Sequence, residues 1–303
     1  MEQKGLIFGR RIVIGLLMFV TMFTFGCSSR LELLQERLGM INDPRLDQVV
    51  RKNIEVTGGL ELWSQTGSIV GDAIATVYEQ DGSSSLIEQQ HQVNAGKCFS
   101  VTVISKESSG ELREYLDGLG RVTVIHDGAE ESILEQDRAV LYGAGLKLLL
   151  EGQSITGLFC WLEKDVTVRY SALERKGGRA SHKLEITGRL LARDSEEETL
   201  AVDDLLVVWV NAESFHVERL WFQYQKPGRT EKFGYLAAQV SDYQQEPSGL
   251  TLPGRIEFLS SNKDQQFSRS HILSMEFLRL KGISEADKKR NGSFFSRVSR
   301  IGR

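Results

Sequence analysis

The strongest indication of the fold comes from residues 205–224, which read LLVVWVNAESFHVERLWFQY. Leu205–Val210 is an unbroken apolar run containing the β-branched and aromatic residues that favour strands. Asn211–Ser214 supplies the polar residues of a turn, and His216–Tyr224 then returns to a strand-like pattern. Two such runs on either side of a short turn predict an antiparallel hairpin.

Further strands are predicted on both sides of this hairpin, where apolar residues recur with a period of two. Glycine is plentiful at 29 residues and proline is scarce at 4, a balance typical of short strands joined by turns. The other predicted strands are Ile69–Tyr78, Leu86–Val93, Phe99–Ser105, Leu112–Leu116, Arg121–His126, Phe159–Trp161, Val166–Ala172, Ser181–Thr187, Phe233–Tyr243, Leu252–Ser260 and Ser268–Leu280.

Helical spacing of apolar residues replaces the two-residue period in a few places. A short helix is expected around Leu31–Leu38 and a longer amphipathic one over Arg45–Val56. Glu131–Leu150 suits helices that are interrupted near Gly143 and Gly145.

The N-terminus has the pattern of an export signal. Three basic residues precede an uncharged run, residues 12–26, which suits a signal peptide and falls short of the about 20 residues that a bilayer span needs. The run ends at Gly26-Cys27 and resembles the bacterial lipobox, in which a small residue precedes a cysteine that receives diacylglycerol. Thr24 and Phe25 depart from the aliphatic and small residues usual there. We therefore expect removal of residues 1–26 and lipidation of Cys27.

An uncleaved signal anchor is the alternative to lipidation. If Cys27 is lipidated, residues 27–45 form a tether to the membrane, and its acyl chains exceed the two signals that stable anchoring requires. By the same resemblance, Ser28 after the cysteine implies sorting to the outer membrane, with the protein facing the periplasm. The expected location is the cell envelope.

Residues 46–283 are predicted to form one α+β domain with about eleven strands and a few helices. Two places in it resemble the LolA/LolB-like family of periplasmic lipoprotein carriers. One is the amphipathic helix that leads into the sequence GGLELW at residues 58–63 and then the first strand. The other is the hairpin of residues 205–224, followed by Tyr243 and the sequence GLTLP at residues 249–253. The resemblance implies a strongly curved antiparallel sheet, an incomplete β-barrel, covered by helices.

The resemblance also implies a lipid or acyl ligand, because the family holds acyl chains in the cavity between sheet and helices. Each candidate lining residue would serve equally as ordinary core, since alternation does not distinguish a filled interior from a hollow one. Phe159–Trp161 either projects toward a membrane or forms a buried strand. The alternative function is a structural or interaction lipoprotein with a solid core and no ligand. The candidate lining residues are Trp63, Ile74, Leu146, Leu149, Trp209, Trp221 and Phe258.

Catalytic and metal-binding patterns are missing from the sequence. It has no nucleophile elbow, no CxxC pair and no phosphate-binding glycine loop. His126-Asp127 is explained by the end of a strand and a turn. We therefore expect no enzymatic activity, no cofactor and no metal. The histidines are scattered, at His91, His126, His182, His216 and His271.

The remaining expectations concern charge and cysteines. The formal net charge of -4 argues against a nucleic-acid partner, which requires clustered basic residues. In an oxidising compartment, Cys98 and Cys160 either form a disulfide or stay as two separate buried thiols. Residues 284–303 are polar and basic, which predicts a flexible tail or a weak contact with anionic lipid headgroups.

Overall fold

A single large sheet and a few helices make up the part of the chain that the structure describes. The computed structural model describes residues 30–79, 81–95, 100–107, 110–116, 122–127, 129–130, 138–162, 166–188, 190, 204–225, 233–284 and 287. Its helices are α2 (Arg30–Gly39), α3 (Pro44–Val56), α4 (Leu60–Gln65), α5 (Arg138–Thr156) and the 3₁₀ helix η2 (Gly157–Trp161). Its strands are β1 (Thr66–Tyr78), β2 (Ser84–Asn94), β3 (Ser100–Glu107), β4 (Gly110–Leu116), β5 (Val122–His126), β6 (Ala129–Glu130), β7 (Thr167–Lys176), β8 (Arg179–Gly188), β9 (Asp204–Asn211), β10 (Val217–Gln225), β11 (Phe233–Ser241), β12 (Gln244–Gln245), β13 (Thr251–Leu252), β14 (Arg255–Ser261) and β15 (Phe267–Ser284).

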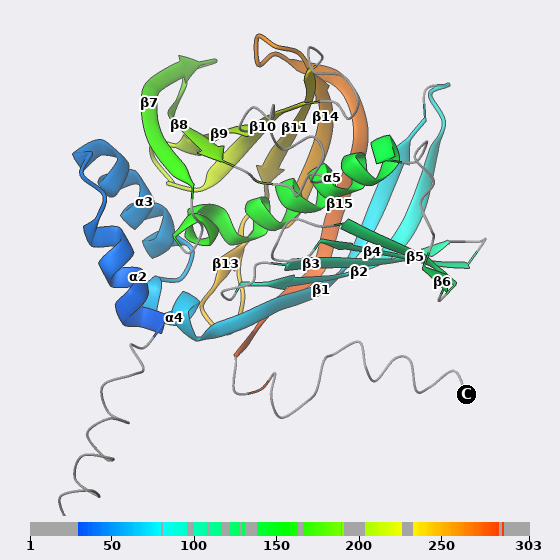
Figure 1. Ribbon diagram of the computed structural model, residues 1–303, viewed down its shortest axis with the longest axis horizontal. Helices are drawn as coiled ribbons and strands as arrows, with labels where there is room; N and C mark the ends of the chain where they lie inside the picture. Colours follow the sequence, from blue (N-terminus) through cyan, green and yellow to red (C-terminus); the bar gives the residue numbers. More distant parts are fainter. Residues whose placement is uncertain are drawn as a thin grey trace, which may run out of the picture.

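The described sheet has 13 strands in the order β6-β5-β4-β3-β2-β1-β15-β14-β11-β10-β9-β8-β7, and every neighbouring pair is antiparallel. The central pairing joins β1 to β15, so the two ends of the domain meet in the middle of the sheet. Figure 1 shows that the sheet is strongly curved, with α5 crossing the space between its two wings and α2, α3 and α4 gathered at one end. Since β6 and β7 are edges, the described sheet is not closed into a barrel.

The start and end of α3 follow from local chemistry. Asp43 caps the helix by accepting hydrogen bonds from the backbone N–H groups of Arg45 and Leu46, at 2.8 and 3.3 Å. Pro44 occupies the first turn, where its missing N–H costs nothing. Gly58, with φ at +133°, supplies the backbone conformation in which the chain leaves the helix.

The curved sheet buries side chains on both faces in its β9 region. Leu206, Val208 and Val210 belong to the large core shared with α5, which we call the concave core. The alternate residues Val207 and Trp209 belong to a separate cluster, which we call the convex cluster. Because successive strand residues point to opposite faces, these two groups lie on opposite sides of the sheet. The convex cluster consists of Val207, Trp209, Trp221, Ala237 and Leu259.

The predicted fold class, an α+β domain with a curved antiparallel sheet covered by helices, is confirmed. Leu60–Trp63, quoted above within the GGLELW motif, lies in the short helix α4. The predicted strand Leu252–Ser260 is divided into β13 and β14 by Pro253-Gly254. In the described residues no helix is both long and apolar enough to cross a membrane.

Two predicted elements were wrong. The expected interruption near Gly143 and Gly145 does not occur, and α5 runs on to Thr156, because burial of the segment that begins at Gly145 outweighs the roughly 1 kcal/mol that a helical glycine costs. Phe159–Trp161 is buried, as one of the two alternatives expected, but it lies in the 3₁₀ helix η2 and not in a strand. Asn53 accepts a hydrogen bond from the Leu158 N–H at 2.9 Å and so holds this segment in a helical turn.

Candidate functional site

The candidate site is the space between the concave face of the sheet and α5. The segment 145–162, which covers the end of α5 and all of η2, is buried throughout except at the partly exposed Lys147. A helix segment that is buried on every side and mainly apolar must be surrounded by other, mainly apolar surface. Here the concave face of the sheet supplies that surface, and α5 contacts strands of both wings, including β3, β4, β10 and β14.

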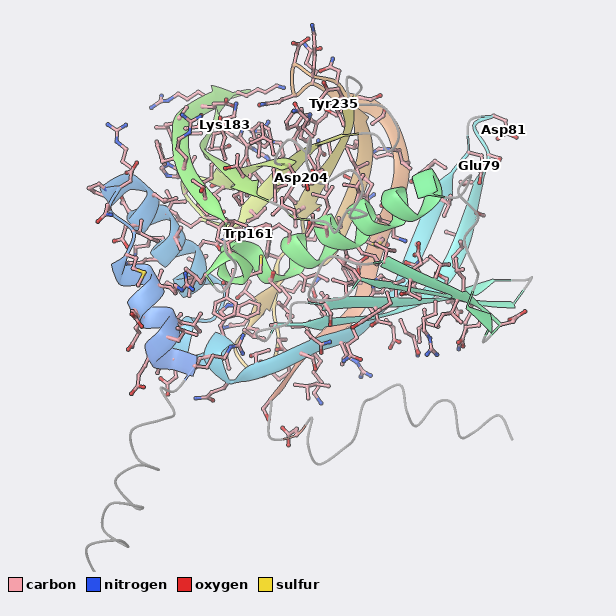
Figure 2. All side chains as sticks on the ribbon, in the orientation of Figure 1. Glu79, Asp81, Trp161, Lys183, Asp204 and Tyr235 are labelled. Atoms are coloured by element: carbon pink, nitrogen blue, oxygen red, sulfur yellow. The ribbon has the colours of Figure 1, made fainter. Side chains whose placement is uncertain are left out.

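The end of this interior near α3 is fixed by aromatic stacking and by hydrogen bonds. The Trp63 and Phe159 rings stack at a centroid distance of 5.1 Å, and Trp63 donates from Nε1 to Thr57 Oγ1 at 3.1 Å. Asn53 accepts from the Leu158 N–H and donates from Nδ2 to the Phe215 carbonyl oxygen at 2.8 Å. Figure 2 shows Trp161 at this end of α5, far from Glu79 and Asp81 at the tip of the β1–β2 hairpin.

Four of the residues predicted to line a cavity lie in the concave core. Trp63, Leu146, Leu149 and Phe258 have exposed fractions of 0%, 1%, 1% and 2%. They come from α4, α5 and β14, so the fold brings together residues far apart in the sequence. Their role as ligand contacts stays a prediction.

The other three predicted lining residues face away from α5. Trp209 and Trp221 lie in the convex cluster, and Ile74 is half-buried between Ala73 and Ala75, whose side chains point into the concave core. A ligand between the sheet and α5 would be separated from these side chains by the sheet itself. We therefore withdraw Ile74, Trp209 and Trp221 from the set of candidate contacts.

A group of polar side chains that sequence reasoning missed lies inside the concave face. His91 on β2 and Glu151 on α5 are 1% and 0% exposed, and His91 Nδ1 lies 2.5 Å from Glu151 Oε1. Lys147, one helical turn before Glu151, donates from Nζ to Glu114 Oε2 on β4 at 2.7 Å. On β2, Gln89 donates from Nε2 to Ser105 Oγ at 2.9 Å. The available signal was two charged residues, Lys147 and Glu151, within a mainly apolar helix.

The protonation of Lys147 is controlled by its neighbours. Burial lowers the pKa of the Lys147 ammonium, but the carboxylates of Glu114 and Glu151 outweigh it and raise the pKa above the ordinary value. The lysine therefore stays charged at neutral pH. Its charge is shared between carboxylates on α5 and on the sheet, which ties the helix to the β4 wing.

His91 and Glu151 have the arrangement of the base and the orienting acid of a catalytic triad. In a triad the other ring nitrogen would take a proton from a serine or cysteine. Among the described residues, His91 Nε2 has no hydrogen-bond partner. The geometry thus supplies two members of a triad without a nucleophile, and the absence of enzymatic activity stays a prediction.

The remaining sequence-based candidates have separate positions. Asp127 accepts a hydrogen bond from the Glu111 N–H at 2.9 Å, as expected of a turn residue. Cys160 is buried and its thiol donates to Gln153 Oε1 at 2.6 Å. Cys27 and Cys98 lie outside the described residues, as do most of residues 284–303, so lipidation, the disulfide and the tail stay predictions. Within the described ranges no group of three or more potential ligands could hold a metal ion.

The convex cluster is held by cations and a carboxylate around Trp209. The Arg219 guanidinium lies 4.9 Å and the Lys183 ammonium 5.6 Å from the indole centroid. Trp209 donates from Nε1 to Glu174 Oε2 at 2.8 Å. Burial raises the pKa of the Glu174 carboxyl, but hydrogen bonds from Trp209 and Lys183 hold it below the ordinary value. This cluster is therefore a structural unit with its polar groups satisfied.

Comparison with known structures gives likenesses of fold. A LolA superfamily protein from Nitrosomonas europaea is 15% identical, with a TM-score of 0.49 over 80% of this chain and 95% of that one. A DUF1329 family protein from Desulfovibrio piger is 10% identical, with a TM-score of 0.50 over 81% and 97%. An outer membrane lipoprotein-sorting protein domain from Vibrio parahaemolyticus is 12% identical, with a TM-score of 0.49 over 80% and 96%. No protein-family model and no curated protein sequence matches the chain.

Proposed function

We propose that this chain is a lipid-anchored protein of the bacterial cell envelope that binds an acyl ligand between its curved sheet and α5. The anchor is a diacylglyceryl group on Cys27, which places the domain in the periplasm at the outer membrane. The ligand contacts are Trp63, Leu146, Leu149 and Phe258, which share the concave core. The protein acts as a carrier or receptor and performs no chemistry on the ligand.

The observation that carries this proposal is that α5 is an apolar helix enclosed by a curved sheet that is not closed. Such a helix fills a hydrophobic hollow much as an acyl chain would, through non-directional contacts. An acyl chain that lies beside α5, or displaces it, replaces one apolar contact with the concave face by another, so the exchange costs little free energy. The residues that resemble LolA/LolB-like carriers support the same function.

Native mass spectrometry of the full chain, released from detergent micelles, tests the anchor and the ligand together. The proposal expects a polypeptide that begins at Cys27 and carries covalent acyl groups, with an additional lipid mass that is lost at higher collision energy. A polypeptide that begins elsewhere, or that carries no acyl mass, contradicts the anchor. A chain without bound lipid that takes up none when lipid is added contradicts the carrier.

The Cys27→Ala variant tests the anchor separately. Without the thiol no diacylglyceryl group can be attached, so the precursor is expected to keep its full mass in cell membranes. Its electrophoretic mobility is compared with that of the unaltered chain and of a Ser28→Ala variant, which retains the cysteine. Processing of Cys27→Ala at the same position would contradict lipidation.

A second candidate function is an interaction protein of the envelope in which α5 fills the interior permanently. The continuous burial of residues 148–162 favours it. The two candidates differ in whether lipid enters the concave core. The added-lipid arm of the mass spectrometry separates them, because only a carrier forms a lipid complex of fixed stoichiometry.

A further inference from the structure

A set of polar side chains interrupts the apolar surface between the sheet and α5. On the sheet, His91 of β2 lies opposite Val103 of β3, which in turn lies opposite Glu114 of β4. Gln89 lies one pleat away from His91 on the same face, opposite Ser105. We call the set the interior polar row; its members are Gln89, His91, Ser105, Glu114, Lys147 and Glu151.

The interior polar row contains hydrogen-bonding atoms that nothing in the described structure satisfies. Gln89 Oε1, His91 Nε2 and Glu151 Oε2 are buried without a partner, while the opposite atom of each side chain is bonded. The three residues are 5%, 1% and 0% exposed, so bulk water does not reach them freely. Leaving one such atom unpaired costs about 1–3 kcal/mol. A group that supplies the missing hydrogen bonds would recover part of that cost.

The charges of the interior polar row indicate which kind of ligand head group it can bind. The carboxylates of Glu114 and Glu151 outnumber the single ammonium of Lys147, so the row has no surplus of positive charge even when His91 is protonated. A phosphate or carboxylate head would therefore meet repulsion in a poorly solvated place. The unpaired Gln89 and Glu151 oxygens are acceptors, and a hydroxyl group can donate to them.

The surroundings of the row also suit the chain of an amphiphile. Leu146 and Leu149 of α5 flank Lys147 and belong to the concave core. The ring of Phe277 on β15 packs edge-on against His91 at a centroid distance of 5.2 Å. Polar atoms at one place, with apolar side chains around them, match a molecule that has a small polar head and a hydrocarbon tail.

We propose that the interior polar row binds the uncharged, hydroxyl-bearing head of an acylglycerol-type lipid, with the acyl chain lying against α5. This inference rests on the proposed function, and it adds the head chemistry of the ligand. The head hydroxyls donate to Gln89 Oε1 and Glu151 Oε2. The hydroxyl oxygens remain available as acceptors, so His91 Nε2 can donate to one of them when it carries a proton.

The test compares lipids that share one acyl chain and differ in the head. The full chain, washed free of bound lipid in detergent, is mixed with equal amounts of monooleoylglycerol, oleic acid and oleoyl lysophosphatidic acid, and the complexes are counted by native mass spectrometry. Two hydrogen bonds to unpaired buried atoms predict about tenfold more monooleoylglycerol complex than oleic acid complex.

Variants show whether the row causes this preference. Glu151→Gln keeps the side-chain volume and removes one negative charge, so the preference over oleic acid is expected to fall to about twofold or less. Glu88→Gln is the matched control, because Glu88 is exposed on β2 next to Gln89, and successive strand residues point to opposite faces of the sheet. It is expected to keep the preference of the unaltered chain.

The outcomes separate the two proposals. If all three lipids bind in equal amounts, or if Glu151→Gln retains the full preference, the head chemistry is wrong while the acyl carrier stands. If none of the three lipids binds, the proposed function itself fails. Should Glu151→Gln not fold, the ratio measured on the unaltered chain still decides, because a row that only holds water gives no discrimination among heads.

Discussion

Replacing Asn53 by leucine is expected to destabilise the protein, because Asn53 connects α3 to the segment that follows the end of α5. Asn53 is 1% exposed on α3, and it is bonded at the same time to Leu158 of η2 and to Phe215 before β10. Leucine has a similar volume but leaves the buried Leu158 N–H and the part-buried Phe215 carbonyl oxygen without partners. At about 1–3 kcal/mol for a buried unsatisfied group and less for a part-buried one, the free energy of unfolding should fall by about 1–4 kcal/mol.

The assay is equilibrium urea unfolding of the full chain in detergent, followed by tryptophan fluorescence, since Trp63 and Trp161 lie at this end of the interior. Lys52→Leu is the matched control: it is the neighbouring residue on the same helix, and its ion pair with Glu55 at 2.8 Å is exposed. Loss of such a surface pair should change the free energy of unfolding by less than about 1 kcal/mol. If Asn53→Leu costs no more than Lys52→Leu, the two hydrogen bonds do not hold α3 to η2.

Three further predictions concern stability. Gly71→Ala should destabilise the sheet by about 1–3 kcal/mol in urea unfolding, because its Cβ would come within 2.2 Å of a backbone oxygen of β15, whereas Gly39→Ala meets nothing within 4 Å and should change little. Trp63→Phe should cost about 1–2 kcal/mol in urea unfolding followed by far-ultraviolet circular dichroism, because the hydroxyl of Thr57 loses its indole donor; an unchanged midpoint would refute this. Hydrogen bonds to the Glu174 carboxylate outweigh the effect of burial, so its pKa in the folded protein lies below the ordinary 4.5. The ionised carboxylate therefore stabilises the fold fully above pH 4.5. This stabilisation is lost as the pH falls through the folded pKa. The difference in thermal midpoint between the unaltered chain and Glu174→Gln should accordingly shrink between neutral pH and pH about 3.

The sequence predicted the strands and turns well, because those depend on local patterns. The Asn211–Ser214 turn is an example: Asn211 Oδ1 accepts from the N–H groups of Glu213 and Ser214, each at 2.9 Å, so the turn is specified by its own residues. The helix α3 is similar, since its cap at Asp43 and its end at Gly58 are both local.

The face on which a side chain lies was harder to predict. Leu205–Val210 is apolar throughout because the concave core covers one side and the convex cluster the other, so no alternation distinguishes Val208 from Trp209. Near Ile74 the pattern misled for a different reason. The small side chains Ala73 and Ala75 point into the interior, and the larger isoleucine points outward.

The interior polar row could not be predicted from spacing at all. His91 and Glu151 are 60 residues apart, and their contact depends on how α5 crosses the sheet. Sequence reasoning treated His91 as one of several scattered histidines. A polar residue on an apolar strand face identifies a candidate, but only the tertiary structure supplies its partner.

Photocrosslinking can show whether an acyl chain lies between α5 and the concave face of the sheet. The full chain in lipid nanodiscs receives monoacylglycerol with a diazirine at the end of its chain, and labelled peptides are identified by mass spectrometry after irradiation. We expect label on peptides that contain Leu146, Leu149 or Phe258. Label found only on peptides of the convex cluster, around Trp209 and Trp221, or only on residues near the membrane anchor, would contradict it.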